Sequence, residues 1–371
     1  MWKYWTGSCA QKDSIGQQVH CLLEQLLYEK QGDRIIKVTF FVACETASDY
    51  REKLANLEIA CRQVFSYPLL ITLVPQAPIE HDLYLEAWYL PSGIEATINF
   101  ECRGDLRLLR ISGADELMIV HTHTLTGNVE NDARSCFSLL QKLIDRESLS
   151  FDHLFRQWNY IGNILQQEDG KQNYQQFNEV RSGFFAGSNF PAGYPAATGI
   201  GMDIPGVIIE ACFLNSDQLK PVGITSPIQL SAHSYSEKVL VSLLTRKSTP
   251  KFERAKALVN HQSSTIFISG TAAILGEASS PSGSYEEQTG QTIDAIEQLV
   301  SRENLNLYAF IMPASEFKYH NVRVYLKDGY ISPSIREQVA TYFSYQHTLF
   351  LKADVCRDEL LVEIEAELKI N

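Results

Sequence analysis

The stretch Ala353-Asp354-Val355-Cys356-Arg357-Asp358-Glu359-Leu360-Leu361-Val362-Glu363-Ile364-Glu365-Ala366 ends in an alternation of aliphatic and acidic residues. Successive side chains of a strand point to opposite faces, so Glu363 and Glu365 share one face and the aliphatic residues share the other. Taken alone, this pattern predicts an edge strand with solvated carboxylates. Two weaker copies of the same ending occur earlier in the chain, and they favour a more specific interpretation.

The three copies close three successive segments with a similar order of strands and helices. In the first segment we expect helices at 14–29 and 48–65 and strands at 35–42, 69–74 and 82–88. In the second we expect strands at 95–100, 106–111, 117–121, 154–161, 197–202 and 207–213, with helices at 132–145 and 174–185. In the third we expect strands at 227–232, 265–270, 322–327 and 349–352, with helices at 291–300 and 335–343. Glu86, Glu210 and Glu363 are therefore expected at one shared place in a threefold repeat, whose first copy lacks its opening hairpin.

This order predicts an α/β (α+β) fold with one sheet and two helices per unit. We divide the chain into units 1–92, 93–218 and 219–371 and expect their sheets to pack around a pseudo-threefold axis, with the helices outside. Such a chain is expected to be a monomer with an internal pseudo-trimer. The Gly/Ser/Pro-rich stretch at 276–284 is predicted to be a mobile loop within the third unit.

Composition excludes several classes of protein. The formal net charge of −12, without a basic run, argues against nucleic-acid binding. No stretch approaches the roughly 18 uninterrupted apolar residues of a membrane helix. The start, Met1-Trp2-Lys3-Tyr4-Trp5, does not resemble a signal peptide, so a cytoplasmic location is expected.

Metal and disulfide chemistry are not expected. The eight cysteines are scattered without a CxxC pair, which is typical neither of a zinc site nor of a disulfide framework. His121 and His123 lie two apart on one expected strand without further ligands nearby. We therefore predict neither a metal nor a cofactor.

Two families resemble the chain. The closing motif of the RidA (YjgF-type) fold is similar to Pro195-Ala196-Ala197-Thr198-Gly199-Ile200-Gly201 and Val362-Glu363-Ile364-Glu365-Ala366. RidA proteins are homotrimers with ligand sites between subunits. The chorismatase family is a closer match, through five motifs from Arg156 to the C-terminus: Arg156-Gln157-Trp158-Asn159-Tyr160, Tyr174-Gln175-Gln176-Phe177-Asn178-Glu179-Val180-Arg181, Tyr194 to Gly201, Phe267-Ile268-Ser269-Gly270-Thr271-Ala272, and Asp354 to Glu365.

The chorismatase resemblance implies cleavage of chorismate with release of pyruvate. Protonating the enolpyruvyl ether requires a carboxylic acid held protonated near neutral pH, which burial achieves by raising its pKa. Glu363 is the expected acid. Gly270 and Cys356 resemble the members that form 3-hydroxybenzoate, with Cys356 acting either as a nucleophile or as a group that shapes the site; a buried thiol without a catalytic role is the equal alternative.

A substrate with two carboxylates requires cations in its pocket. Arg181, beside Asn178 on an expected helix, is the first candidate, although a solvated arginine on the helix surface is equally compatible with the pattern. Tyr160, Gly270, Thr271 and Lys327 complete the expected substrate-binding set.

The chain also departs from the family. A basic segment expected after Tyr235 is replaced by Ser236-Glu237-Lys238-Val239-Leu240-Val241, for which Arg246-Lys247 are the nearest substitutes, and Lys327 replaces an arginine. The substrate-gripping arginine of RidA enzymes is also missing, because the corresponding places hold Leu69, Ala197 and about His347 or Thr348. Enamine or imine deamination is therefore the second hypothesis, and ligand binding without turnover is the third.

Overall fold

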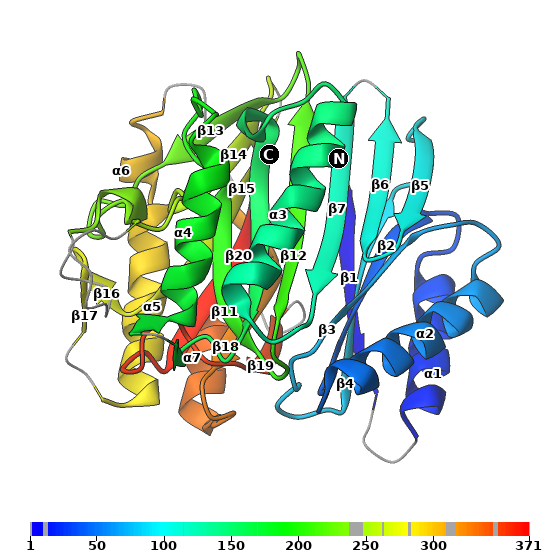
Figure 1. Ribbon diagram of the computed structural model, residues 1–371, viewed down its shortest axis with the longest axis horizontal. Helices are drawn as coiled ribbons and strands as arrows, with labels where there is room; N and C mark the ends of the chain where they lie inside the picture. Colours follow the sequence, from blue (N-terminus) through cyan, green and yellow to red (C-terminus); the bar gives the residue numbers. More distant parts are fainter. Residues whose placement is uncertain are drawn as a thin grey trace.

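Three sheets form the interior of the chain (Figure 1). The computed structural model describes residues 2–9, 14–113, 115–168, 170–236, 248–261, 263–280, 283–308, 317–343 and 348–370. The first sheet contains β1 (Lys3–Ser8), β4 (Leu83–Leu90), β2 (Arg34–Val42) and β3 (Leu70–Val74), in that order.

The second sheet has the order β11 (Ala196–Met202), β8 (Leu154–Gly162), β12 (Val207–Asn215), β7 (Glu116–Thr124), β6 (Leu106–Ser112), β5 (Thr97–Arg103). The third has the order β13 (Lys220–Ile224), β14 (Ala255–Val259), β15 (Ser264–Ala272), β20 (Val362–Ile370), β18 (Phe317–Leu326), β19 (Thr348–Lys352). Two short ribbons, β9–β10 (Gln167–Glu168, Lys171–Gln172) and β16–β17 (Ile274–Leu275, Ala278–Ser279), lie outside these sheets.

The three sheets repeat one connectivity. The orders β1-β4-β2-β3, β7-β12-β8-β11 and β15-β20-β18-β19 correspond, and in each the last two strands are parallel while the others are antiparallel. The hairpins β5–β6 and β13–β14 extend the second and third sheets, and no such hairpin precedes β1 in the described residues. The predicted repeat of RidA-like units, with a first copy that lacks its opening hairpin, is confirmed.

Two long helices per unit cover the outer faces of the sheets (Figure 1). They are α1 (Ile15–Glu29) and α2 (Ala47–Val64), α3 (Val129–Arg146) and α4 (Asn173–Phe185), and α5 (Tyr285–Leu299) and α7 (Pro333–Phe343). The short helices α6 (Arg302–Leu305), η1 (Phe151–His153) and η2 (Ala232–Ser234) lie in connections. Side-chain caps fix the starts of several helices: Ser14 forms a capping box with Gln17, and Thr46 accepts from the Asp49 N–H.

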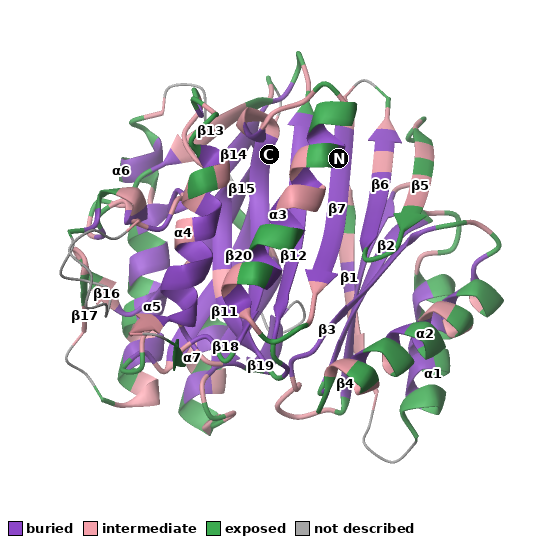
Figure 2. Cartoon of the chain, in the orientation of Figure 1, coloured by how far each residue is buried: buried purple, intermediate pink, exposed green. Residues whose placement is uncertain are grey.

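Burial follows the layers (Figure 2). The strands are buried along most of their length, while the helices expose their outward faces. One large apolar cluster joins residues of all three units around Trp88 and Trp158, and separate clusters fill the space beneath the helices of the second and third units. Among the helices of the described residues, none is long and apolar enough to cross a membrane.

Three strands of the main sheets, and the four short strands of the ribbons, were not predicted from the sequence. The expected strand at 227–232 is absent, since this segment leads into η2, and the third unit opens instead with β13 and β14. β1 was also missed. These three strands have only five or six residues each, and tertiary pairing rather than local pattern defines them. The predicted mobile loop at 276–284 contains β17, which pairs with β16 just before it, and residues 281–282 lie outside the described part.

The acidic strand β20 is central rather than an edge, because it pairs with both β15 and β18. Glu363, Glu365 and Glu367 are only 4%, 3% and 4% exposed, so the interpretation of solvated carboxylates is wrong. All three lie on the inner face, as the alternation predicted, while Val362 and Ile364 pack beneath the helices.

The strand register also corrects which glutamate the repeat shares. Glu86 pairs with Thr39 three residues beyond the Val42–Leu83 pair, and Glu210 pairs with Trp158 three residues beyond Ile161–Val207. Counting likewise from Leu326–Val362 leads to Glu365, opposite Arg323. The counterpart of Glu86 and Glu210 is therefore Glu365. Glu363 has Tyr84 and Ile208 as its counterparts, so its carboxyl is peculiar to the third unit.

Candidate active site

A cavity lies at the seam between the second and third units. Its walls come from α4 and β11 of the second unit and from β14–β15, β20 and the loop before β20 in the third. It is lined by Tyr174, Arg181, Ala197, Gly199, Tyr235, Pro250, Phe252, Arg254, Gly270, Ala272, Ile274, Cys356, Arg357 and Glu363. We call this place the second–third seam.

Glu363 supplies the only carboxyl group among the residues that line this cavity. Within the described part of the chain, no side chain or backbone group hydrogen-bonds to it. Burial, reinforced by the negative charge of Glu365, raises the pKa of Glu363 to about 8. At neutral pH this carboxyl is therefore mostly protonated and available to donate.

Gly270 makes the space that the Glu363 carboxyl occupies. A Cβ atom at position 270 would lie 2.0 Å from Glu363 Oε1 and 3.1 Å from Thr198 Cγ2. The Gly270 N–H donates to Thr198 Oγ1 at 3.1 Å, which holds the bulge of β15 against β11. A side chain at this position would displace the acid.

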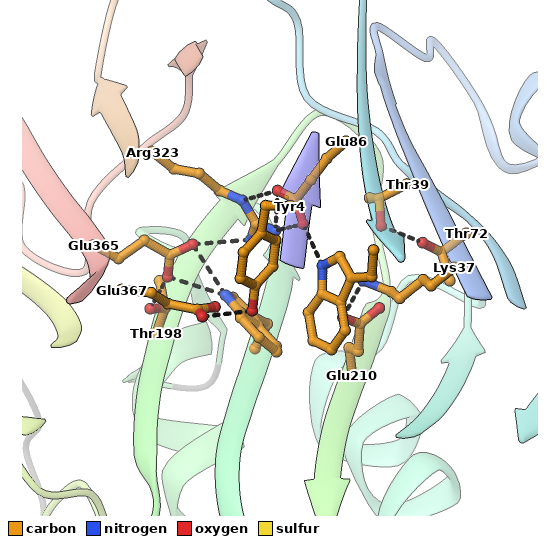
Figure 3. A network of polar contacts seen from close by, with 12 residues as sticks. Tyr4, Lys37, Thr39, Thr72, Glu86, Thr198, Glu210, Arg323, Glu365 and Glu367 are labelled. Atoms are coloured by element: carbon orange, nitrogen blue, oxygen red, sulfur yellow. Dashed lines mark hydrogen bonds and ion pairs between the residues drawn. The ribbon is translucent and has the colours of Figure 1, made fainter. Parts of the chain in front are cut away.

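Glu365, two residues further along β20, is held as an anion (Figure 3). Its carboxylate accepts hydrogen bonds from five side chains: Arg156 (2.5 Å), Thr198, Trp158 (3.0 Å), Arg323 (2.9 Å) and Tyr325 (3.0 Å). Burial alone would raise the pKa of Glu365, but the charges of Arg156 and Arg323 outweigh it and hold that pKa below its usual value. The anionic Glu365 in turn favours the protonated form of Glu363.

Further ion pairs extend this network across the units (Figure 3). Arg323 donates to both carboxylate oxygens of Glu86, at 3.0 and 2.8 Å. Lys37 Nζ lies 2.7 Å from Glu210 Oε1, so a carboxylate from each unit is paired near the shared centre. Such buried ion pairs add specificity to the packing of the units because a misplaced unit would leave a buried charge unpaired.

Arg181 is a buried cation without an anionic partner. It is 2% exposed, and its only hydrogen bond among the described residues, from Nη2 to Asn178 Oδ1, is 2.6 Å long. Its Nε has no hydrogen-bond partner. Burial lowers the pKa of Arg181 to about 10, so it stays charged at neutral pH. The solvated surface arginine considered from the sequence is thus not what the structure shows.

Arg254 and Arg357 bring two more guanidinium groups to the cavity. Arg254 donates from Nη2 to Leu230 O at 2.7 Å and to the hydroxyl of Tyr235, and Arg357 donates from Nη1 to Glu277 O at 2.9 Å. Neither forms an ion pair with a described residue. Three cations that lack carboxylate partners around one cavity form a site for a substrate with more than one anionic group.

Cys356 and Tyr174 lie beside the acid. Burial, with the nearby Glu363, raises the pKa of the Cys356 thiol to about 12. The sulfur is therefore a neutral thiol at physiological pH, which disfavours a thiolate nucleophile. Tyr174 comes close to β11 because position 199 is a glycine: a Cβ there would lie 2.9 Å from Tyr174 Cε2.

Comparisons with known proteins agree with this geometry. A family model described as "Chorismatase FkbO/Hyg5-like, N-terminal" matches residues 97–214. A 3-hydroxybenzoate synthase of Streptomyces hygroscopicus is 28% identical over 247 residues, which are 65% of this chain and 70% of that protein. A chorismatase of the same organism is 30% identical over 221 residues, 59% of this chain and 62% of that protein.

The chain is thus similar to proteins of the chorismatase family over the matched residues. A crystal structure of a chorismatase matches 99% of this chain and 98% of its own, with a TM-score of 0.71 and 20% identity, which shows that the fold is shared over the whole length.

The structure brings together half of the residues predicted for the site. Glu363, Cys356, Arg181 and Gly270 line the cavity, and Asn178 orients Arg181 from behind. The other predicted residues, Tyr160, Thr271 and Lys327, do not line it.

Tyr160 lies in the central network, where its hydroxyl accepts from Arg323 Nη1 at 3.2 Å. Thr271 turns inward and donates to Ser269 O at 2.9 Å. Lys327 is bound to Asp358 through Nζ contacts of 2.6 Å with its backbone and side-chain oxygens. Tyr160 and Thr271 are held by buried neighbours, and Lys327 is held by the exposed Asp358, so none of the three faces the cavity.

Two arginines from other segments line the cavity in place of the basic segment that the sequence lacks after Tyr235. Arg254 stands just before the missed strand β14, and Arg357 follows Cys356 directly. Arg357 could have been predicted as a site residue because it directly follows Cys356. Arg254 could not, because strand β14, which places it at the cavity, was not predicted. Arg246 and Lys247 lie outside the described residues.

The described residues contain no group of three or more His, Cys, Asp and Glu side chains that could hold a metal ion. His121 is buried, and burial lowers its pKa well below the usual value. The eight cysteines are free thiols.

Proposed function

We propose that this chain cleaves chorismate to 3-hydroxybenzoate and pyruvate, with Glu363 as the general acid. The observation that carries the proposal is a buried carboxyl group that faces a cavity lined by three arginines. Among the described residues, the carboxyl has no hydrogen-bond partner and the arginines have no anionic partner. The names of the similar proteins, 3-hydroxybenzoate synthase and chorismatase, support the same substrate and product.

Glu363 has the properties that the first step needs. Cleavage of an enol ether begins when its methylene carbon takes a proton, and a carboxyl with a pKa of about 8 still holds that proton at neutral pH. The electrons of the double bond form the new C–H bond, and the adjacent carbon becomes an oxocarbenium ion. Loss of the proton leaves Glu363 as a carboxylate that can offset this positive charge.

The three guanidinium groups orient the substrate. Chorismate carries a ring carboxylate and an enolpyruvyl carboxylate, and arginine forks bind carboxylates with two parallel hydrogen bonds. Arg181 reaches the cavity from α4, and Arg254 and Arg357 reach it from the third unit. Cations on both sides of the seam would hold the two ends of the substrate and place the ether beside Glu363.

The product follows from how the oxocarbenium ion is captured. Capture by the neighbouring ring hydroxyl leads to 3-hydroxybenzoate and pyruvate without consuming water, whereas capture by water gives the dihydrodiol. The neutral thiol of Cys356 and the bare Gly270 are the residues that resemble the 3-hydroxybenzoate-forming members. Because its thiol stays protonated, we assign Cys356 a shaping and proton-donating role rather than that of a nucleophile.

We also infer that the units 1–92, 93–218 and 219–371 hold within one polypeptide the arrangement that three subunits form in a trimer. Light scattering tests this proposal, and a monomer mass is the expected result. A stable trimer would contradict it.

Incubation of the purified chain with chorismate tests the activity. Pyruvate should appear, and chromatography should show 3-hydroxybenzoate as the aromatic product. Absence of pyruvate at high enzyme concentration would exclude chorismate cleavage, and a dihydrodiol or the 4-isomer would overturn the product assignment. Imine hydrolysis in a coupled amino-acid oxidase assay would instead support the deaminase alternative.

A further inference from the structure

A second cavity, of about 950 Å³, lies between the first and third units. It is formed by the start of β1 and the end of β4 in the first unit and by the starts of β15 and β18 and the end of β20 in the third. It is lined by Trp2, Lys3, Tyr4, Lys30, Tyr89, Thr265, Lys318, His320, Glu367, Leu368 and Lys369. We call it the basic cavity.

The charge of this cavity is opposite to that of the whole chain. Four lysines and one histidine line it, with Glu367 as the only carboxyl among the lining residues, although the net charge of the chain is −12. Lys3, Lys30 and Lys369 form no ion pair with any described residue. Gathering like charges without counter-charges is unfavourable, so the arrangement is suited to an anion from solution.

Aromatic rings provide apolar walls for the same cavity. Trp2 stacks on Trp88 with ring centroids 5.1 Å apart, and Lys30 Nζ lies 4.9 Å from the centre of the Tyr89 ring. Tyr4 is oriented by its neighbours, since Trp2 Nε1 donates to its hydroxyl at 2.5 Å. Flat apolar walls beside cations favour a ligand that is itself planar and anionic.

Glu367 adds a polar atom without a partner. Its Oε2 accepts from the Tyr4 hydroxyl at 2.5 Å (Figure 3), but its buried Oε1 has no hydrogen-bond partner. Buried polar atoms are normally satisfied, so an unpaired oxygen in the wall of a cavity indicates a missing partner. Burial raises the pKa of Glu367 to about 8, and a protonated Glu367 can donate to an anionic oxygen.

We propose that the basic cavity is a second binding site, separate from the catalytic cavity, for a small aromatic carboxylate. The ring would lie against Trp2 and Tyr89, and the carboxylate would contact Lys3, Lys30 or Lys369. This inference does not depend on the proposed function, since it rests on the lining of another cavity. If that function holds, the product 3-hydroxybenzoate is itself a ligand of the expected class.

Calorimetric titration with benzoate tests the proposal. An Arg254→Ala variant serves as the starting protein, because the substitution weakens carboxylate binding in the catalytic cavity. One saturable site per chain is expected. Adding Lys3→Ala and Lys369→Ala should weaken benzoate binding about tenfold, which corresponds to about 1.4 kcal/mol.

A matched control keeps the same loss of charge elsewhere. Lys142→Ala with Arg103→Ala, both exposed on the second unit, should leave benzoate affinity unchanged. Inorganic phosphate should compete poorly, because it has no face to stack on the aromatic walls. Equal weakening in both double variants, displacement by phosphate at matched ionic strength, or no saturable binding at millimolar benzoate would each overturn the proposal.

Discussion

The second–third seam and the corresponding seam between the first and second units share the same strands and helices. They differ in whether an equivalent arginine has a carboxylate partner. In the second–third seam, Arg254 has no carboxylate partner and faces a cavity. In the first–second seam, Arg107 Nη2 lies 2.7 Å from Glu58 Oε1. The two arginines correspond, since Arg107 pairs with His121 on β7, and Arg254 O accepts from Ser269 N on β15.

The groups around these arginines differ in the same sense. Opposite Glu210, the first–second seam carries the imidazole of His121, whereas the bulge opposite Glu365 contains Gly270. Ile208 takes the position of Glu363. In one seam the arginine forms an internal ion pair with Glu58. In the other, a glycine and an extra carboxyl stand beside an arginine that has no carboxylate partner among the described residues. Binding capacity in this fold therefore depends on leaving cations without internal partners.

The largest expected effect comes from removing the acidic proton of Glu363. The equivalent residue in the first–second seam, Ile208, has no such proton. Glu363→Gln should reduce kcat for pyruvate release about a thousandfold, since general acid catalysis contributes about 10²–10⁴-fold. Steady-state kinetics measures this change. Glu303→Gln, an exposed control on α6, should keep full activity, and comparable activity of the two variants would remove the general-acid assignment.

Filling the space beside the acid should have the next largest effect. Gly270→Ala places a Cβ atom 2.0 Å from the present position of Glu363 Oε1, so the carboxyl must move. A displacement of this kind can lower kcat about a hundredfold. Gly183→Ala, on α4 with no atom near the new Cβ, is the matched control. Chromatography of the products reports whether the dihydrodiol gains over 3-hydroxybenzoate; an unchanged kcat and product would contradict the role of Gly270.

Copying the ion pair of the first–second seam into the second–third seam should weaken substrate binding. Arg181→Glu offers Arg254 an internal partner of the kind that Glu58 provides to Arg107, and KM should rise about thirtyfold, as expected when a buried charge contact is lost. Arg181→Gln, which introduces no buried charge, should also raise KM. It serves as a second variant in case Arg181→Glu does not fold. Arg134→Gln on the exposed face of α3 should leave KM unchanged. A fall in kcat alone would place Arg181 outside substrate binding.

The pH profile should show the smallest effect. Because Glu363 donates a proton and its pKa is raised to about 8, activity should be retained below that value and fall as pH rises through it. Between pH 7 and pH 9, kcat/KM should drop about tenfold. An activity that rises with pH in this range would indicate a base rather than an acid.

The repeat, its missing hairpin and the inner face of the last strand could be predicted from sequence because they depend on local periodicity. The shared glutamate was misassigned since β20 carries two candidates, although the recurring Glu86-Ala87, Glu210-Ala211 and Glu365-Ala366 pairs distinguish them. Arg181 was ambiguous because one-dimensional spacing does not reveal that α4 is buried within the seam. Arg254 was missed because its position depends on the pairing of β14 with β15, which the local sequence pattern does not predict.

The covalent joining of three units has a consequence for how such a site can arise. In a trimer of identical chains, every substitution occurs three times. A buried acid and unpaired cations would therefore destabilise all three interfaces. In this chain Tyr84, Ile208 and Glu363 differ at one equivalent position, so the proposed catalytic acid is present at a single interface. The paired charges of Arg323 with Glu86 and of Lys37 with Glu210 can then hold the assembly while one interface specialises. Because the three units differ in sequence, some interfaces can stabilise the fold while another carries the catalytic residues.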